Sequence, residues 1–286
     1  RPVALRTFRL PTDSAETIRA KIYTYQDPVE LSNCVPIFER MGLFVASESG
    51  FPVRIGSNGR SWWVHDFLMY SDDRAAIRLK EVGAEFEEAF ENVWLNKTEN
   101  DGFNRLVLAI GASWREAALF RTLARYRKQT GLDPAQTTQI QALCIHTGIT
   151  RHLLQAFRLR FDPDLELSLD DRAKESAKMQ REILAELEKV ESLDEDRVLR
   201  RLMSLIYAIQ RTSFFQLDEN GEPLTHIAIK IASGMLEALP DPKPFREIFV
   251  CAPHVEGVHL RFGPVARGGL RWSDRRDDFR TEVLGL

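Results

Sequence analysis

The spacing of apolar residues changes twice along the chain, and this change limits the folds that the chain can adopt. Apolar and polar side chains alternate at 17–23, as in a half-buried strand. Between 73 and 220 apolar residues recur three and four positions apart, which predicts amphipathic helices. Alternation returns at 227–231 and 258–262, around a short apolar run at 247–251. The sequence therefore predicts a mixed α+β protein in which a helical region separates two sheet-containing parts.

The first part is predicted to be a β-α-β-β module. A helix is expected to begin at a cap within Leu31-Ser32-Asn33 and to stop at Gly42, because glycine tolerates the left-handed turn after a helix. Asn58-Gly59 is a strong hairpin signal before the apolar run at 62–64. The expected strands are 17–23, 43–46 and 53–55.

Three domains are expected from these patterns. They are an N-terminal module at 1–73, a helical region at 74–222 and the first strands of an α/β domain at 223–286. The last two helices of the middle region, at about 170–192 and 194–216, are expected to form an antiparallel pair. Because the chain begins without methionine, we expect it to be part of a longer polypeptide.

Composition excludes several classes of protein. Lys and Arg total 39 against 42 Asp and Glu, so the net charge of −3 argues against a globally basic nucleic-acid binder. No apolar stretch approaches the ~20 residues that span a bilayer. Three widely spaced cysteines argue against a secreted disulfide framework. A cytoplasmic protein without nucleic-acid or membrane partners is expected.

The arginine-rich stretch at 261–280 carries the clearest chemical signal. A predicted strand ends at Gly263-Pro264, and Arg267 is followed by Gly268-Gly269. An arginine fork binds a carboxylate through two hydrogen bonds, and glycine lets the backbone approach a ligand closely. Spacing alone favours the alternative, a solvated turn whose arginines pair with the carboxylates of 274–278. Those interspersed carboxylates also argue against a nucleic-acid contact.

Three other patterns have a structural interpretation that we prefer. His65-Asp66 could form an acid–base pair, but neighbours on a strand point to opposite faces, so we expect Asp66 to cap a turn and His65 to be satisfied locally. Cys251 with His254 and His259 lacks a fourth zinc ligand, so we expect a core cysteine and no metal site. Trp62-Trp63 is expected to pack rather than to stack on bases.

The C-terminal stretch resembles a known family. The runs RFGPVARGGLRWS at 261–273 and DFRTEVLGL at 278–286 are similar to the opening of the catalytic domain of large bacterial NAD-specific glutamate dehydrogenases. Smaller glutamate dehydrogenases carry a lysine where Arg267 stands. Leu31-Ser32, Pro36, 41–43 and 65–67 resemble the regulatory region of the large family, an ACT-like β-α-β-β module, and the middle region resembles its helical linker.

The resemblance implies a function and a set of substrate-binding residues. The parent protein would interconvert L-glutamate with 2-oxoglutarate and ammonia using NAD. Arg267 would help to hold a substrate carboxylate, the backbone of Gly268 and Gly269 would lie against the substrate, and Arg271 and Ser273 would support the loop.

The same resemblance predicts what this chain lacks. The catalytic lysine and the dinucleotide domain would follow Leu286, and no Gly-x-Gly-x-x-Gly follows a predicted strand. No catalytic or cofactor-binding residue is therefore expected in these residues, and the chain alone is expected to be inactive. A homo-oligomer and an amino-acid effector at the ACT-like module are also expected. The alternative is a regulatory amino-acid-binding or assembly module without catalysis.

Overall fold

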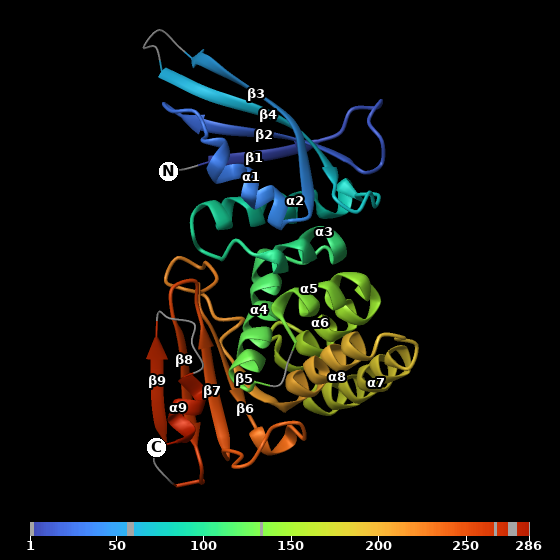
Figure 1. Cartoon of the computed structure of the whole chain (residues 1–286), viewed down its shortest axis with the longest axis vertical. Coiled ribbons are helices and arrows are strands. Elements are labelled where there is room, and N and C mark those ends of the chain that lie inside the picture. Colours follow the sequence, from blue (N-terminus) through green and yellow to red (C-terminus); the bar gives the residue numbers. More distant parts are fainter. Residues whose placement is uncertain (1–2, 56–59, 132–133, 266–267, 274–278, 286) are drawn as a thin grey trace. The chain divides into compact units, whose positions relative to one another are not determined.

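The computed structural model describes residues 3–55, 60–131, 134–265, 268–273 and 279–285. These residues form two compact units, one reaching to Ala118 and the other beginning at Leu119. Each unit contains one antiparallel sheet together with helices (Figure 1). The structure confirms the predicted mixed α+β class.

The first unit is a four-stranded antiparallel sheet in the order β1-β2-β4-β3. Helices α1 and α2 cover one face of this sheet (Figure 1), because the alternating residues Ile18, Ala20 and Ile22 of β2 are buried on that side. The elements are β1 (Val3–Phe8), β2 (Thr17–Tyr25), α1 (Leu31–Arg40), β3 (Leu43–Ile55), β4 (Arg60–Ser71), α2 (Leu79–Trp94), the 3₁₀ turn η1 (Gly102–Arg105) and α3 (Leu106–Ile110).

The structure corrects the prediction for this unit in three places. Strand β1 was not predicted, because apolar residues stand at both odd and even positions, such as Val3 and Phe8, and hide the alternation of a strand. Strand β3 is continuous where two strands were predicted, and Pro52 is tolerated because β3 is an edge strand. Helix α1 begins at Leu31 with Glu30 at its N-cap, so the predicted cap residues lie in the first turn.

Two turn signals of this unit have different outcomes. Gly42 follows α1 with φ of +90°, as the predicted helix stop requires. The hairpin signal at Asn58-Gly59 lies outside the described residues.

The core of the first unit is built around Phe38. Its ring centroid lies 4.9 Å from that of Phe90, 5.2 Å from that of Phe67 and 6.2 Å from that of Phe86. Phe38 and Phe67 belong to α1 and β4, whereas Phe86 and Phe90 belong to α2. One side chain therefore joins both helices to the sheet.

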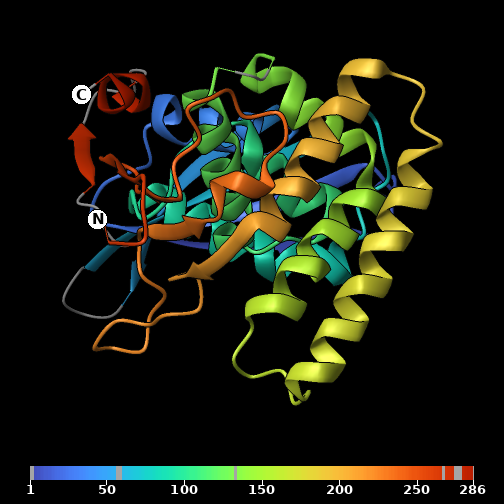
Figure 2. The same ribbon diagram turned by 90° about the horizontal axis from the view of Figure 1, so that it is seen from below.

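The second unit begins with a group of helices. Helices α7 and α8 lie side by side in Figures 1 and 2, as the predicted antiparallel pair. Ser168 and Ser192 cap their N-termini by accepting hydrogen bonds from the backbone N–H groups of Asp171 and Glu195. The helices are α4 (Trp114–Gln129), which contains the boundary between the units, α5 (Gln136–Ile145), α6 (Thr147–Phe161), α7 (Leu169–Leu187) and α8 (Leu193–Ala208).

A five-stranded antiparallel sheet in the order β5-β6-β7-β8-β9 follows. Its predicted strands at 227–231, 247–251 and 258–262 are confirmed within a residue or two. Its elements are β5 (Ile209–Thr212), β6 (Ile227–Ile231), the 3₁₀ turn η2 (Ser233–Met235), β7 (Arg246–Cys251), β8 (Glu256–Arg261), β9 (Gly269–Ser273) and α9 (Phe279–Leu284).

The helix predicted to end at 216 is too long, because the chain leaves α8 after Ala208 and pairs as β5 with β6. Ile209 fits the helical spacing and is also buried as the first residue of β5, so spacing could not locate this boundary. In the described part of the chain, no helix is long and apolar enough to cross a membrane.

Truncation of Phe38 tests whether the first unit depends on this one ring. Phe38→Ala is expected to lower the free energy of unfolding by about 3–5 kcal/mol, because it removes buried apolar area and leaves a cavity. Phe44→Ala is the matched control, since Phe44 is 58% exposed. Urea denaturation measures both, and equal midpoints for the two variants would contradict the assignment.

Candidate functional site

The predicted substrate-binding residues lie on and beside strand β9. Gly269, Arg271 and Ser273 pair with Leu260, Val258 and Glu256 of β8, so they share one face of β9. Gly268 comes directly before the strand. Arg267 lies outside the described residues.

The chain itself fills the space beside both glycines. A Cβ atom at residue 268 would lie 2.2 Å from the carbonyl oxygen of Leu260 and 2.6 Å from Nε2 of His259. A Cβ atom at residue 269 would lie 2.5 Å from Cγ1 of Val283. Internal packing therefore favours glycine at residue 268, where a backbone carbonyl would have to move, and at residue 269 a Cβ atom fits only if the Val283 side chain shifts. Sequence reasoning missed this restriction.

The arginines of this stretch that the structure describes have separate partners. Nε of Arg261 donates to the carbonyl of Gly263 at 2.9 Å, and its guanidinium also donates to the carbonyl of Pro264. Nε of Arg271 lies 3.2 Å from Oε2 of Glu282, with both side chains about half exposed. The alternative pairing with the carboxylates of 274–278 falls outside the described residues.

Arg280 is buried and faces the interior of the unit. Its Nε and Nη2 donate to the two carboxylate oxygens of Glu247 at 2.8 Å each. The exposed fractions of the two side chains are 2% and 0%. Arg280 therefore pairs with a buried carboxylate of the chain itself, although it belongs to the arginine-rich stretch. The signal that could have identified this pair is Glu247, a charged residue at an inward position of a buried strand.

Further polar groups surround this ion pair. Ser233 Oγ donates to Glu247 Oε1 at 2.8 Å, and Gln129 Oε1 accepts from the backbone N–H of Arg280 at 3.2 Å. Burial raises the pKa of Tyr126 well above its ordinary value, and the nearby Glu247 carboxylate adds to this shift. The phenol therefore stays protonated at neutral pH.

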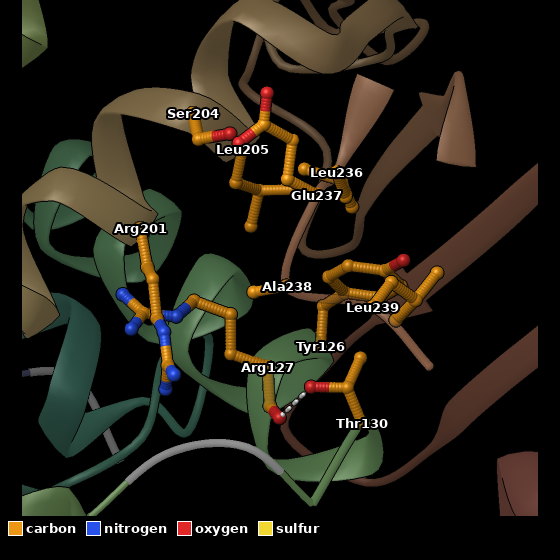
Figure 3. A pocket seen from close by; sticks show the side chains of 10 residues that line it. All are labelled: Tyr126, Arg127, Thr130, Arg201, Ser204, Leu205, Leu236, Glu237, Ala238 and Leu239. Carbon is orange, nitrogen blue, oxygen red and sulfur yellow. Dashed lines mark hydrogen bonds between the residues drawn. The ribbon is translucent and has the colours of Figure 1, made fainter. Parts of the chain in front are cut away.

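A small cavity lies in the same unit, between α4, α8 and the segment after η2. Figure 3 shows the guanidinium groups of Arg127 and Arg201 on one side of this cavity and Glu237 on the other. Thr130 Oγ1 donates to the Arg127 carbonyl at 2.6 Å. The cavity volume is about 50 Å³, which admits a few water molecules at most. It is too small for a dicarboxylate substrate.

The histidine of the first unit is satisfied locally, as predicted. Nε2 of His65 accepts the Val29 backbone N–H at 3.0 Å, so Nδ1 carries the proton and donates to Glu48 Oε1 at 2.6 Å. Asp66 lies on the opposite face, 3.6 Å from Nζ of Lys21. Asp66 is in the middle of β4, so the prediction that it caps a turn is wrong.

Cys251 is a buried residue of β7. Nη1 of Arg125 lies 3.6 Å from its sulfur and 3.3 Å from Oε1 of Glu256. Among the residues that the structure describes, no three His, Cys, Asp or Glu side chains are grouped so that they could hold a metal ion.

The first unit contains a larger cavity beside the loop between β2 and α1. Its volume is about 890 Å³. The lining includes Gln26, Asp27, Ser32, Asn33, Asn96 and Asn100. These side chains offer both hydrogen-bond donors and acceptors to a polar ligand.

Three family models match successive parts of the chain. The ACT3 domain of glutamate dehydrogenase matches residues 2–82, and helical motif 3 of glutamate dehydrogenase matches 98–163. The catalytic domain of bacterial NAD-glutamate dehydrogenase matches 182–286. The chain belongs to the bacterial NAD-specific glutamate dehydrogenase family. The predicted family and the ACT-like character of the N-terminal part are thereby confirmed.

Relatives in the glutamate dehydrogenase family match the chain along its length. The NAD-specific glutamate dehydrogenases of Halomonas elongata and Pseudomonas aeruginosa are each 41% identical over 100% of the chain. The protein of that name in Mycobacterium tuberculosis is 38% identical over 90% of the chain. The chain spans only 17%, 18% and 16% of the lengths of these three relatives.

Substitution of Gly268 tests the packing requirement in this glutamate dehydrogenase segment. Gly268→Ala is expected to lower the free energy of unfolding by about 1–3 kcal/mol, because a backbone carbonyl cannot move aside cheaply. Gly148→Ala in α6 is the matched control, since no atom lies within 4 Å of its added Cβ. Gly148→Ala should leave the free energy of unfolding unchanged or raise it by up to about 1 kcal/mol. Urea unfolding of the chain compares the two, and a Gly268→Ala variant as stable as the control would refute the requirement.

Proposed function

We propose that the full-length protein is an NAD-dependent glutamate dehydrogenase. It would convert L-glutamate, NAD⁺ and water to 2-oxoglutarate, ammonium, NADH and a proton, and catalyse the reverse reaction. The observation that carries this proposal is the 38–41% identity to proteins named NAD-specific glutamate dehydrogenase. The match of a catalytic-domain model to 182–286 supports it.

In this proposal the β8–β9 segment contributes to the substrate site. Arg267 binds a carboxylate of the substrate, because a planar guanidinium matches two carboxylate oxygens. Gly268 and Gly269 hold the backbone next to the substrate, and Arg271 and Ser273 support the segment. The exposed position of Arg271 is compatible with that role.

NAD would bind to a part of the protein other than the described residues. A dinucleotide-binding fold needs parallel strands joined by a glycine-rich turn and a helix. All strand pairs in the two described sheets are antiparallel. The nicotinamide supplies hydride transfer when it is bound. The 286 residues on their own are therefore proposed to be inactive.

We further propose that 1–73 serve a regulatory role, that 74–222 link the domains and that 223–286 begin the catalytic domain. We also propose that the full-length protein is a cytoplasmic homo-oligomer. The ACT-like and catalytic matches at the two ends of the chain support this division of roles.

The activity and the role of Arg267 can be tested together. The full-length protein is expected to consume NADH with 2-oxoglutarate and ammonium, whereas the 286-residue chain is not. Arg267→Ala is expected to raise the KM for 2-oxoglutarate by about 10- to 100-fold, because charge-assisted hydrogen bonds are lost. Arg267→Lys should raise the KM for 2-oxoglutarate by a smaller factor, because lysine keeps the positive charge.

Arg181→Ala is the control for this experiment, because Arg181 is exposed on α7. Its KM for 2-oxoglutarate should equal that of the wild type. Steady NADH consumption by the 286-residue chain would contradict the proposed inactivity. An unchanged KM in Arg267→Ala would remove Arg267 from the site.

The cavity beside the β2–α1 loop favours a second function, which can coexist with the first. We propose that the first unit binds an amino-acid effector there. The volume of about 890 Å³ accommodates an amino acid, and the polar lining can bind both its ammonium and its carboxylate group.

Isothermal titration of the full-length protein with a panel of amino acids other than glutamate, the proposed substrate, tests this second function. At least one amino acid is expected to bind, and Ser32→Phe should abolish the heat of binding because the ring occupies the cavity. Absence of heat from every member of the panel would leave the first unit a structural module.

A further inference from the structure

Helix α9 is too short to hold its own position. It comprises six residues, Phe279–Leu284, and an isolated helix of this length is not stable in water. Its place in the fold must therefore come from its contacts with other elements. Among its described contacts, one is with the interior of the unit and one is with strand β9.

The contact to the interior is the ion pair between Arg280 and Glu247. Two hydrogen bonds of 2.8 Å join the planar guanidinium to the planar carboxylate, so the two groups share one orientation and tie α9 to β7. Ser233 Oγ holds Glu247 from the side, and Gln129 accepts from the Arg280 backbone. Through the ion pair and these two hydrogen bonds, α9 is therefore connected to α4, β7 and η2.

Two residues of α9 contact strand β9. Val283 fills the space beside Gly269, where a Cβ atom would lie 2.5 Å from its Cγ1. Glu282 pairs with Arg271 at 3.2 Å. Gly269 and Arg271 are both predicted substrate-binding residues, so α9 contacts the predicted substrate-binding strand directly at two of its positions.

Strand β9 depends on this support because it lies at the edge of the sheet. Among the described strands it pairs with β8 alone. Backbone hydrogen bonds to β8 hold one edge of β9, but they allow the strand to rotate about its long axis. The packing of α9 against Gly269 restricts that rotation.

We propose that Arg280 and Glu247 are positioning residues for the substrate carboxylate, because their buried ion pair fixes α9, and α9 fixes β9. This inference rests on the proposed glutamate dehydrogenase function. Neither residue contacts the substrate in this arrangement. Because a charge-assisted hydrogen bond to a carboxylate needs its two partners at a narrow range of distances and angles, a small shift of β9 weakens substrate binding measurably.

Arg280→Lys in the full-length protein tests the proposal, because it keeps the charge but loses the two-pronged geometry. The KM for 2-oxoglutarate is expected to rise about tenfold or more, with the KM for NADH unchanged and kcat within about threefold. A merely stabilising role would reduce the amount of active enzyme. It would therefore lower the apparent kcat and leave both KM values unchanged.

Two further variants keep the test interpretable. Val283→Ala loosens the contact between α9 and β9 without leaving a buried charge, and it should raise the same KM even if Arg280→Lys does not fold. Arg160→Lys is the matched control, since the Arg160 guanidinium donates to the carbonyls of Tyr207 and Ile209 at 3.1 and 3.0 Å. Its KM for 2-oxoglutarate should stay at the wild-type value.

Hydrogen exchange of the full-length protein gives a readout that does not require activity. In Arg280→Lys the amides of 269–273 should exchange faster, while those of α7 should not change. A raised KM with faster exchange in β9 supports the proposal, and an unchanged KM in an active variant overturns it. If the wild-type protein shows no glutamate-dependent activity, the proposed function fails. Exchange then decides the positioning role, which unchanged rates in β9 would overturn.

Discussion

Burial of one face of each antiparallel sheet is the constraint on which both units depend. In β2 and β7 every second residue is buried, so the helices of each unit must cover that side. The same alternation places Glu247 in the interior, beside Phe249 and Cys251. A charge at that position is stable only with a buried partner, and Arg280 provides it. The location of α9 thus follows from the periodicity of a strand three elements earlier.

The periodicity was sufficient to predict most of the elements but not all their ends. Strands with clean alternation, such as β6, were found where they were expected. Strand β1 was missed because both of its faces carry apolar residues, and β5 because Ile209 satisfies the helical and the extended pattern alike. In such cases pairing with a distant strand decides the local conformation, and a single window of sequence does not contain that partner.

For the candidate site, the sequence indicated the segment better than the role of each residue in it. A row of arginines suggests a common anionic ligand, yet Arg261 binds backbone carbonyls, Arg271 pairs with Glu282 and Arg280 is buried. These partners lie on β7 and α9 as well as in the adjoining loop. The family was identified from a contiguous run of residues, whereas the separate tasks of the arginines depend on contacts that only the folded chain creates.

The tight packing around Gly268 and Gly269 has a consequence for how this sequence motif is used in genome annotation. Atoms of the chain itself, at Leu260 and Val283, occupy the space beside both glycines. A related chain without catalytic activity would still have the same close approach of Leu260 to Gly268 at its β8–β9 corner. The glycine pair therefore indicates common ancestry and a common fold. Evidence for catalytic activity has to come from side chains that folding does not require.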